Sequence, residues 1–130
     1  MQAAIEQESP QVIRVEVTGR LTSQQWHATL KDVAKRFAPG RSTSILLIAE
    51  GFEGWEPGNW DDLSFQREHD AQIERIAIVA DERWRDRVLM FAGQGLRKVD
   101  IRFFTPAEMS QARQWLAPAP PRDAVRSEGR

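Results

Sequence analysis

The sequence predicts an α/β fold with a mixed, mainly parallel sheet of four to five strands and about four helices. Short segments rich in β-branched residues alternate along the chain with segments whose apolar residues have helical spacing. The chain has 130 residues, of which 41% are hydrophobic and 28% charged, as is usual for one globular domain. Alternating strands and helices favour a mainly parallel sheet because each helix carries the chain back across the sheet.

The first segment with a two-residue period covers residues 12–17 and predicts a strand that ends at Gly19. A shorter partner strand is expected at residues 3–6. A helix should then begin at Thr22, which forms a capping box with Gln25. Its core-facing stripe, which ends before Pro39 and Gly40, consists of Trp26, Leu30, Val33, Ala34 and Phe37.

Three further strand and helix pairs follow. The strands are predicted at residues 44–49, 75–80 and 99–104, and the first two are apolar enough to be buried on both faces. A loop is expected over residues 50–58, and the helices are expected at about 59–72, from Asp81 to about 92, and from Thr105 to 116. Pro106 and Glu108 support a helix start at Thr105, because proline suits the first turn of a helix and glutamate completes a capping box.

Composition excludes several classes of protein. The 18 basic and 19 acidic residues leave no excess of positive charge, so no nucleic-acid partner is expected. The absence of cysteine excludes disulfides and cysteine-based zinc sites. No apolar run is long enough to span a membrane, and the first ten residues lack a signal peptide's features, so a cytoplasmic protein of bacterial type is expected. Residues 1–117 should form one domain, followed by a proline-rich, disordered tail at 118–130.

No catalytic residue is predicted. His27 and His69 stand beside no nucleophile motif, and His69 lies in a charged run typical of a solvated face. The glycines at 93 and 95 follow a helix, so they indicate a turn and not a phosphate cradle.

No metal site and no cofactor are predicted either. Asp61 and Asp62, with Glu53 or Glu56, could supply oxygen ligands, but they lack the regular spacing of a calcium loop. As acids in a first helical turn, the two aspartates already complement the helix dipole.

Large aromatic residues give the most information about function. Trp55 lies in the predicted loop, and Trp60 and Trp84 lie in the first turns of two helices. In a parallel sheet these segments meet at the carboxyl ends of the strands, where ligands of open α/β sheets bind. The predicted ligand-binding residues are therefore Phe52, Trp55, Trp60, Asp81 and Trp84. The alternative, that these rings close the end of the core, remains open.

Two further contacts are considered. Three arginines surround Trp84 in residues 82–87, which would suit a peripheral contact with membrane head groups. Glu82 and Asp86 largely neutralise that run. The N-terminal strand would be an edge strand, and pairing of such edges would give a homodimer.

Several short motifs in order carry a family resemblance over roughly residues 3–117. They are Gly-Arg-Leu-Thr at 19–22, the Leu-Leu-Ile strand running into Gly-Phe-Glu-Gly-Trp at 51–55, Trp-Asp-Asp-Leu at 60–63, Arg-Ile-Ala-Ile-Val at 75–79 before Asp81 and Trp84, and Ala-Arg-Gln-Trp-Leu at 112–116. Together they resemble the SpoIIAA-like family, a branch of the STAS-domain fold. The resemblance implies helices mainly on one face of a mixed sheet.

The resemblance also implies two kinds of function. Some relatives are described as binders of lipid-like or other apolar ligands that associate with membranes. Relatives of the anti-sigma-factor-antagonist type bind a partner kinase, and phosphorylation of a serine at the start of the helix after the Leu-Leu-Ile strand switches them. Residues 50–59 contain no serine or threonine, and Ser64 comes later, within the expected helix. The acidic residues nearby would repel a phosphate, so this switch is not expected.

The leading hypothesis is a non-catalytic binding module that holds an apolar or lipid-like small molecule near the aromatic residues, oriented by Asp81 or backbone amides. The alternative is a protein–protein regulatory adaptor without the phosphorylatable serine, whose acidic segment at 50–62 meets a basic partner. An enzyme is the third hypothesis.

Overall fold

A computed structural model describes residues 2–37, 42–57, 69–92 and 99–117. In this part of the chain, five strands form one sheet in the order β1-β2-β3-β4-β5. The strands are β1 (Gln2–Ser9), β2 (Val12–Leu21), β3 (Thr43–Trp55), β4 (Ile73–Ala80) and β5 (Asp100–Phe104). Strand β1 is antiparallel to β2, and the other three pairs are parallel. The predicted α/β fold with a mixed, mainly parallel sheet is thus confirmed.

The described residues contain three α-helices, which are α1 (Ser23–Ala34), α3 (Arg85–Ala92) and α4 (Met109–Leu116). Short 3-10 turns precede α3 at Glu82–Trp84 and α4 at Pro106–Glu108. The helix expected at 59–72 lies mostly outside the described residues, and its end is a 3-10 turn at Asp70–Gln72. The predicted tail at 118–130 also lies outside them.

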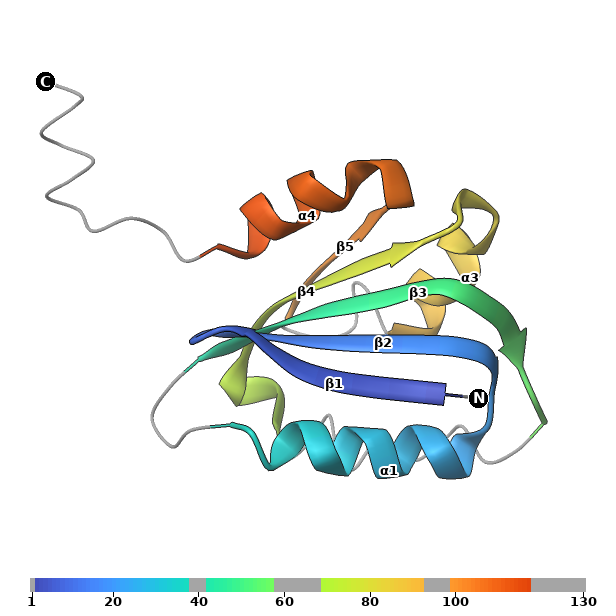
Figure 1. Ribbon diagram of the computed structural model, residues 1–130, viewed down its shortest axis with the longest axis horizontal. Coiled ribbons are helices and arrows are strands. Elements are labelled where there is room, and N and C mark those ends of the chain that lie inside the picture. Colours follow the sequence, from blue (N-terminus) through green and yellow to red (C-terminus); the bar gives the residue numbers. More distant parts are fainter. Residues whose placement is uncertain (1, 38–41, 58–68, 93–98, 118–130) are drawn as a thin grey trace, which may run out of the picture.

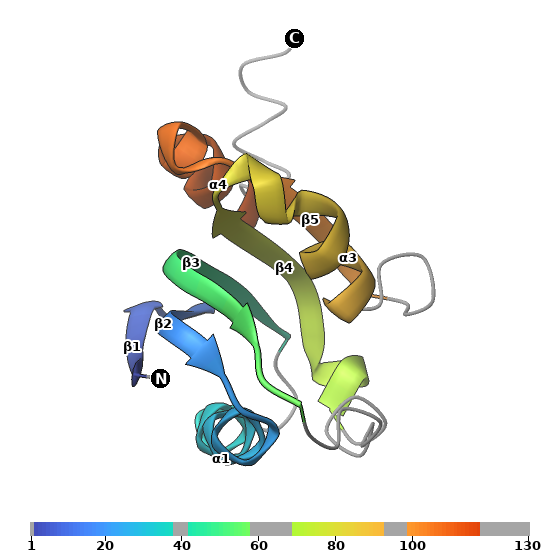
Figure 2. The ribbon, with the colours of Figure 1, turned by 90° about the vertical axis from the view of Figure 1, so that its right-hand side faces the viewer.

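Helices cover both faces of the sheet. Helices α1 and α3 pack on one face through Val33 and Val88, whereas α4 packs on the other through Ala112 and Leu116 (Figures 1 and 2). Two of the three described α-helices share one face, in agreement with the resemblance, and α4 covers the other face. Strand β3 lies between the two layers, with Ile45 on one side and Leu46 on the other.

Two helix starts have the capping chemistry that the sequence predicts. The backbone N–H of Gln25 donates to the Thr22 hydroxyl oxygen over 3.2 Å. The backbone N–H of Thr105 donates to the Glu108 carboxylate over 2.9 Å, and the Thr105 hydroxyl donates to the same oxygen over 3.2 Å. These bonds satisfy backbone and side-chain groups at the helix ends, which fixes where α1 and the turn before α4 begin.

Strands β1, β2, β3 and β4 are all longer than predicted, and the extensions of β2 and β3 bear on the candidate site. Gly19 does not end β2, which continues to Leu21 with Gly19 at a φ of +78°. Residues 50–55 are not a loop but the last part of β3. The register between β2 and β3 shifts at Glu16/Thr18 and again at Gly19/Arg20, and each shift inserts one extra residue into β3. Such bulges break the two-residue period, which is why the pattern indicates a loop.

Helix α4 covers only part of its face of the sheet, and the uncovered part, formed by β1 and β2, carries charged side chains. Arg14 forms ion pairs with Glu6, with Glu8 at 3.4 Å and with Glu16 at 3.1 Å. Arg113 of α4 donates to Glu8 over 2.6 Å, which joins this helix to the hairpin. Polar side chains on this face keep half of the sheet hydrated while α4 shields the apolar half.

Substitution of Leu46 by alanine should lower the free energy of unfolding by about 2–5 kcal/mol, because Leu46 is fully buried in the middle of the sheet. The matched control is Leu47→Ala, one residue further on the same strand, where the side chain is only half-buried. Urea denaturation followed by tryptophan fluorescence measures both variants. Equal losses would contradict the view that the buried middle of β3 holds the two layers together.

Candidate functional site

Three aromatic side chains gather beyond the carboxyl end of the sheet. The ring centroids of Phe52 and Trp55 lie 4.8 Å apart, those of Phe52 and Trp84 lie 4.9 Å apart, and those of Trp55 and Trp84 lie 5.9 Å apart. All three pairs meet edge to face, an arrangement that aromatic quadrupoles favour. We call these three residues the aromatic cluster.

The last residues of β3 place the first two rings. Gly54 is buried and has a φ of +113°, a conformation that L side chains rarely adopt. It lies between Phe52 and Trp55 and turns the strand so that both rings meet. The Arg20 side chain donates to the Trp55 carbonyl over 3.3 Å, and the Glu56 N–H donates to the Leu21 carbonyl over 2.8 Å. These bonds hold the end of β3 against β2.

Trp84 reaches the cluster from the turn before α3. The Asp81 carboxylate accepts the backbone N–H of Arg83 over 3.0 Å and caps that turn. The guanidinium carbons of Arg83 and Arg87 lie 5.3 and 5.8 Å from the Trp84 ring centroid, within the range of cation–π attraction. Trp84 therefore has aromatic rings on its inner side and positive charge nearby.

The cluster continues into the core through two rings that sequence analysis did not place in the site. The ring centroid of Phe91 in α3 lies 5.3 Å from that of Trp55, and the ring centroid of Trp26 in α1 lies 5.8 Å from that of Phe91. The stripe of the first predicted helix marks Trp26 as core-facing, but it does not show that this helix meets Phe91 of α3 at one end of the sheet. The five rings thus form a continuous row from α1 to the turn before α3.

The structure brings together three of the five predicted site residues. Phe52, Trp55 and Trp84 are in mutual contact, while Asp81 directs its carboxylate to the backbone of its own turn. Trp60 lies outside the described residues. Phe52 is buried, and Trp55 and Trp84 are half-buried. The Trp55 indole N–H is buried and has no hydrogen-bond partner among the described residues.

Exposed carboxylates belong to the same stretch of β3 as Phe52 and Trp55. Glu50 and Glu53 belong to the bulged part of β3, and both side chains are exposed. Neither forms an ion pair within the described residues. This stretch of β3 therefore carries negative charge that no described residue neutralises.

Other candidate chemistry finds less support in the described part of the chain. There, no group of three or more histidine, aspartate or glutamate side chains is placed to hold a metal ion. His69 is half-buried and not on a solvated face, because its ring lies 5.6 Å from that of Phe37 and its Nδ1 lies 3.0 Å from the Gln72 side-chain oxygen. No described helix has the length and apolar character needed to cross a membrane.

Comparison with known proteins identifies the family. The sequence profile described as SpoIIAA-like matches residues 12–117. The chain belongs to the SpoIIAA-like family. The match includes the whole of β2 to β5 as well as all three described α-helices. No curated protein matches the chain.

Two solved structures share the SpoIIAA-like fold. One is an uncharacterised protein of the DUF3478 family from Shewanella loihica PV-4, with a TM-score of 0.67 and 18% identity, covering 89% of this chain and 93% of that one. The other is the anti-sigma factor antagonist SpoIIAA in its unphosphorylated form, with a TM-score of 0.60 and 14% identity, covering 90% of this chain and 100% of that one. At these identities the likeness shows the fold alone.

Substitution of Gly54 by alanine should lower the free energy of unfolding by about 1–3 kcal/mol, because of the strained backbone conformation. An added Cβ would lie 3.5 Å from Cη2 of Trp84, which is an ordinary contact distance. The loss should therefore be nearly the same in a Trp84→Ala background, within about 0.5 kcal/mol. A much smaller loss in that background would show that the Trp84 ring, and not φ, requires glycine.

Proposed function

We propose that this SpoIIAA-like protein is a non-catalytic binding module that acts on a protein partner through the carboxyl end of β3. The observation that supports this most is that the rings of the aromatic cluster pack against one another. These contacts hold the end of β3, the same stretch of strand that carries the exposed Glu50 and Glu53, in one conformation. A strand end held in one conformation can present its charges to a partner with little loss of conformational entropy on binding.

The fold supports the same proposal. SpoIIAA is named for antagonising an anti-sigma factor, which is a protein, so one structural neighbour acts through a protein partner. The charges on β3 favour a partner with a basic contact surface, because Glu50 and Glu53 have no ion-pair partner within the described residues. Residues 50–57 include no serine or threonine, so the described end of β3 offers no hydroxyl for phosphorylation.

Reversing both charges, in Glu50→Lys/Glu53→Lys, should abolish partner capture from lysate of the protein's own host. The matched control, Glu74→Lys/Asp100→Lys, changes the net charge equally at exposed sites near the amino ends of β4 and β5. The wild type and the control should retain the same partner, identified by mass spectrometry, and higher salt should weaken its capture. Capture by all three proteins, or loss in the control as well, would refute the proposed interface.

A second candidate function is the binding of an apolar molecule with a hydrogen-bond acceptor. The buried Trp55 indole N–H favours it, because this donor has no partner in the described part of the chain and a ligand could supply the acceptor. Such a ligand would have to displace packed rings. The membrane contact, the homodimer and the role of Asp81 in orienting a ligand stay predictions.

Native mass spectrometry of the protein purified from its own host separates the two candidates. If a small molecule is bound, the added mass should be present in the wild type and in Glu50→Lys/Glu53→Lys. It should be lost from Trp55→Phe, which keeps an aromatic ring but removes the indole N–H. A wild type without added mass would eliminate the second candidate under the conditions of growth.

A further inference from the structure

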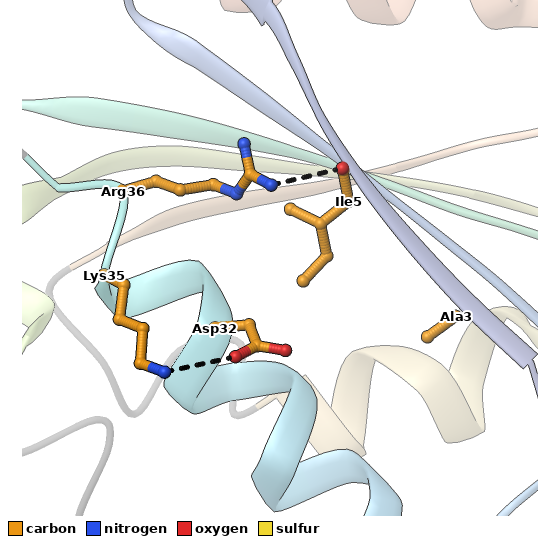
Figure 3. A pocket seen from close by; sticks show the side chains of 5 residues that line it. All are labelled: Ala3, Ile5, Asp32, Lys35 and Arg36. Carbon is orange, nitrogen blue, oxygen red and sulfur yellow. Dashed lines mark hydrogen bonds and ion pairs between the residues drawn. The ribbon is translucent and has the colours of Figure 1, made fainter.

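The outer edge of β1 and the end of α1 enclose a groove that the proposed function does not use. Figure 3 shows its lining, which consists of Ala3, Ile5, Asp32, Lys35 and Arg36. The groove has a volume of about 440 Å³. It lies at the opposite edge of the sheet from β5 (Figure 2), and none of its lining residues belongs to the aromatic cluster.

Hydrogen-bond directions show that this edge offers a row of backbone groups. The Ser44 N–H donates to the Gln11 carbonyl over 2.8 Å, so the backbone of Gln11 faces β3. Because these directions alternate along a strand, the backbone N–H and C=O groups of Arg14 and Glu16 point toward β1. The backbone groups of their cross-strand partners, Glu6 and Ala4, must then point toward β2. The residues between and beside them, Ala3, Ile5 and Gln7, direct their N–H and C=O groups away from the sheet.

A hydrogen bond from Arg36 is independent evidence that the Ile5 carbonyl points away from the sheet. The Arg36 guanidinium donates to the carbonyl oxygen of Ile5 over 3.5 Å, as Figure 3 shows. The bond is long, and the Arg36 side chain is exposed, so an N–H from an added strand could replace it. An added strand would also release the guanidinium to bind another acceptor.

The charge of the groove indicates which strand would fit. Lys35 lies 3.7 Å from Asp32, and this pair is exposed, whereas Arg36 forms no ion pair with a described residue. The lining therefore carries one positive charge in excess. A second copy of the chain pairing through β1 would bring its own Lys35 and Arg36 to the same groove, where like charges repel.

We propose that the edge of β1 binds an extended acidic segment of a protein partner, which adds as a sixth strand. Its backbone pairs with Ala3, Ile5 and Gln7, while a glutamate or aspartate that faces α1 pairs with Arg36. Recognition by strand addition obtains its affinity from main-chain bonds and its specificity from alternate side chains, and both are available here. The protein would then bind a basic partner at the end of β3 and an acidic one at β1.

The test uses labelled peptides as long as β1, which has 8 residues. One alternates threonine with glutamate, and its control alternates threonine with lysine. In amide NMR titrations to millimolar concentration, the glutamate peptide should shift the amide signals of Ala3, Ile5 and Gln7 and protect them from hydrogen exchange. Ala4 and Glu6, which already face β2, should change little. The glutamate peptide should bind at least about tenfold more tightly than the lysine peptide.

Three variants separate the parts of this proposal. Arg36→Glu should weaken binding of the glutamate peptide by about tenfold. Lys31→Glu makes the same change of charge at an exposed site of α1 that does not line the groove, and it should alter binding by less than about twofold. Ala3→Pro removes an outward N–H without breaking the β1–β2 ladder, and it should also weaken binding.

Three outcomes would overturn the proposal. The first is that neither peptide shifts the outward amides, and the second is that both peptides bind equally. The third is concentration-dependent self-association that protects the same amides without peptide, which would assign the edge to a second copy. Because Glu50 and Glu53 are unchanged in every variant, these outcomes leave the interface at the end of β3 to be judged separately.

Discussion

The rest of the structure depends on β3 having apolar side chains on both faces. Ile45 and Ala49 contact the layer of α1 and α3, and Leu46 and Ile48 contact the layer of α4. Because all four are buried, the strand cannot shift by one residue without exchanging its two sets of neighbours. This fixed register determines where β3 reaches the edge of the core, and hence where Phe52 and Trp55 lie.

The two bulges then change what the strand presents. Up to Ile48 the strand follows the regular alternation, and beyond it each extra residue alters which side chains face outward. As a result Glu50 and Glu53 reach solvent while Phe52 and Gly54 remain buried. A single strand thus supplies the centre of the core and the charged surface of the proposed interface. We therefore expect stability and binding to be separable at this site, because Glu50 and Glu53 are exposed while the rings pack against one another.

Much of the fold could be predicted from local sequence patterns. The strand at 75–80 and the caps at Thr22 and Thr105 follow from β-branched residues and side-chain chemistry that act within a few positions. The face that α4 covers could not be predicted, because an apolar stripe does not specify the side of the sheet on which it packs. The continuation of β3 was predicted as a loop, since glycines and bulges remove the period that identifies a strand. The sequence predicted that Phe52, Trp55 and Trp84 come together, but residue type alone cannot distinguish rings that line a cavity from rings that fill one.

The strand order has a consequence for how the chain assembles. Each strand in the described sheet lies next to the strand that precedes it in the sequence. During synthesis each new strand can therefore pair with a strand that has already been made. No segment has to insert between two earlier strands. The ion pair of Arg113 with Glu8 spans 105 positions and forms only when α4 arrives. The domain can thus be built in the order of its synthesis, with α4 as its closing element.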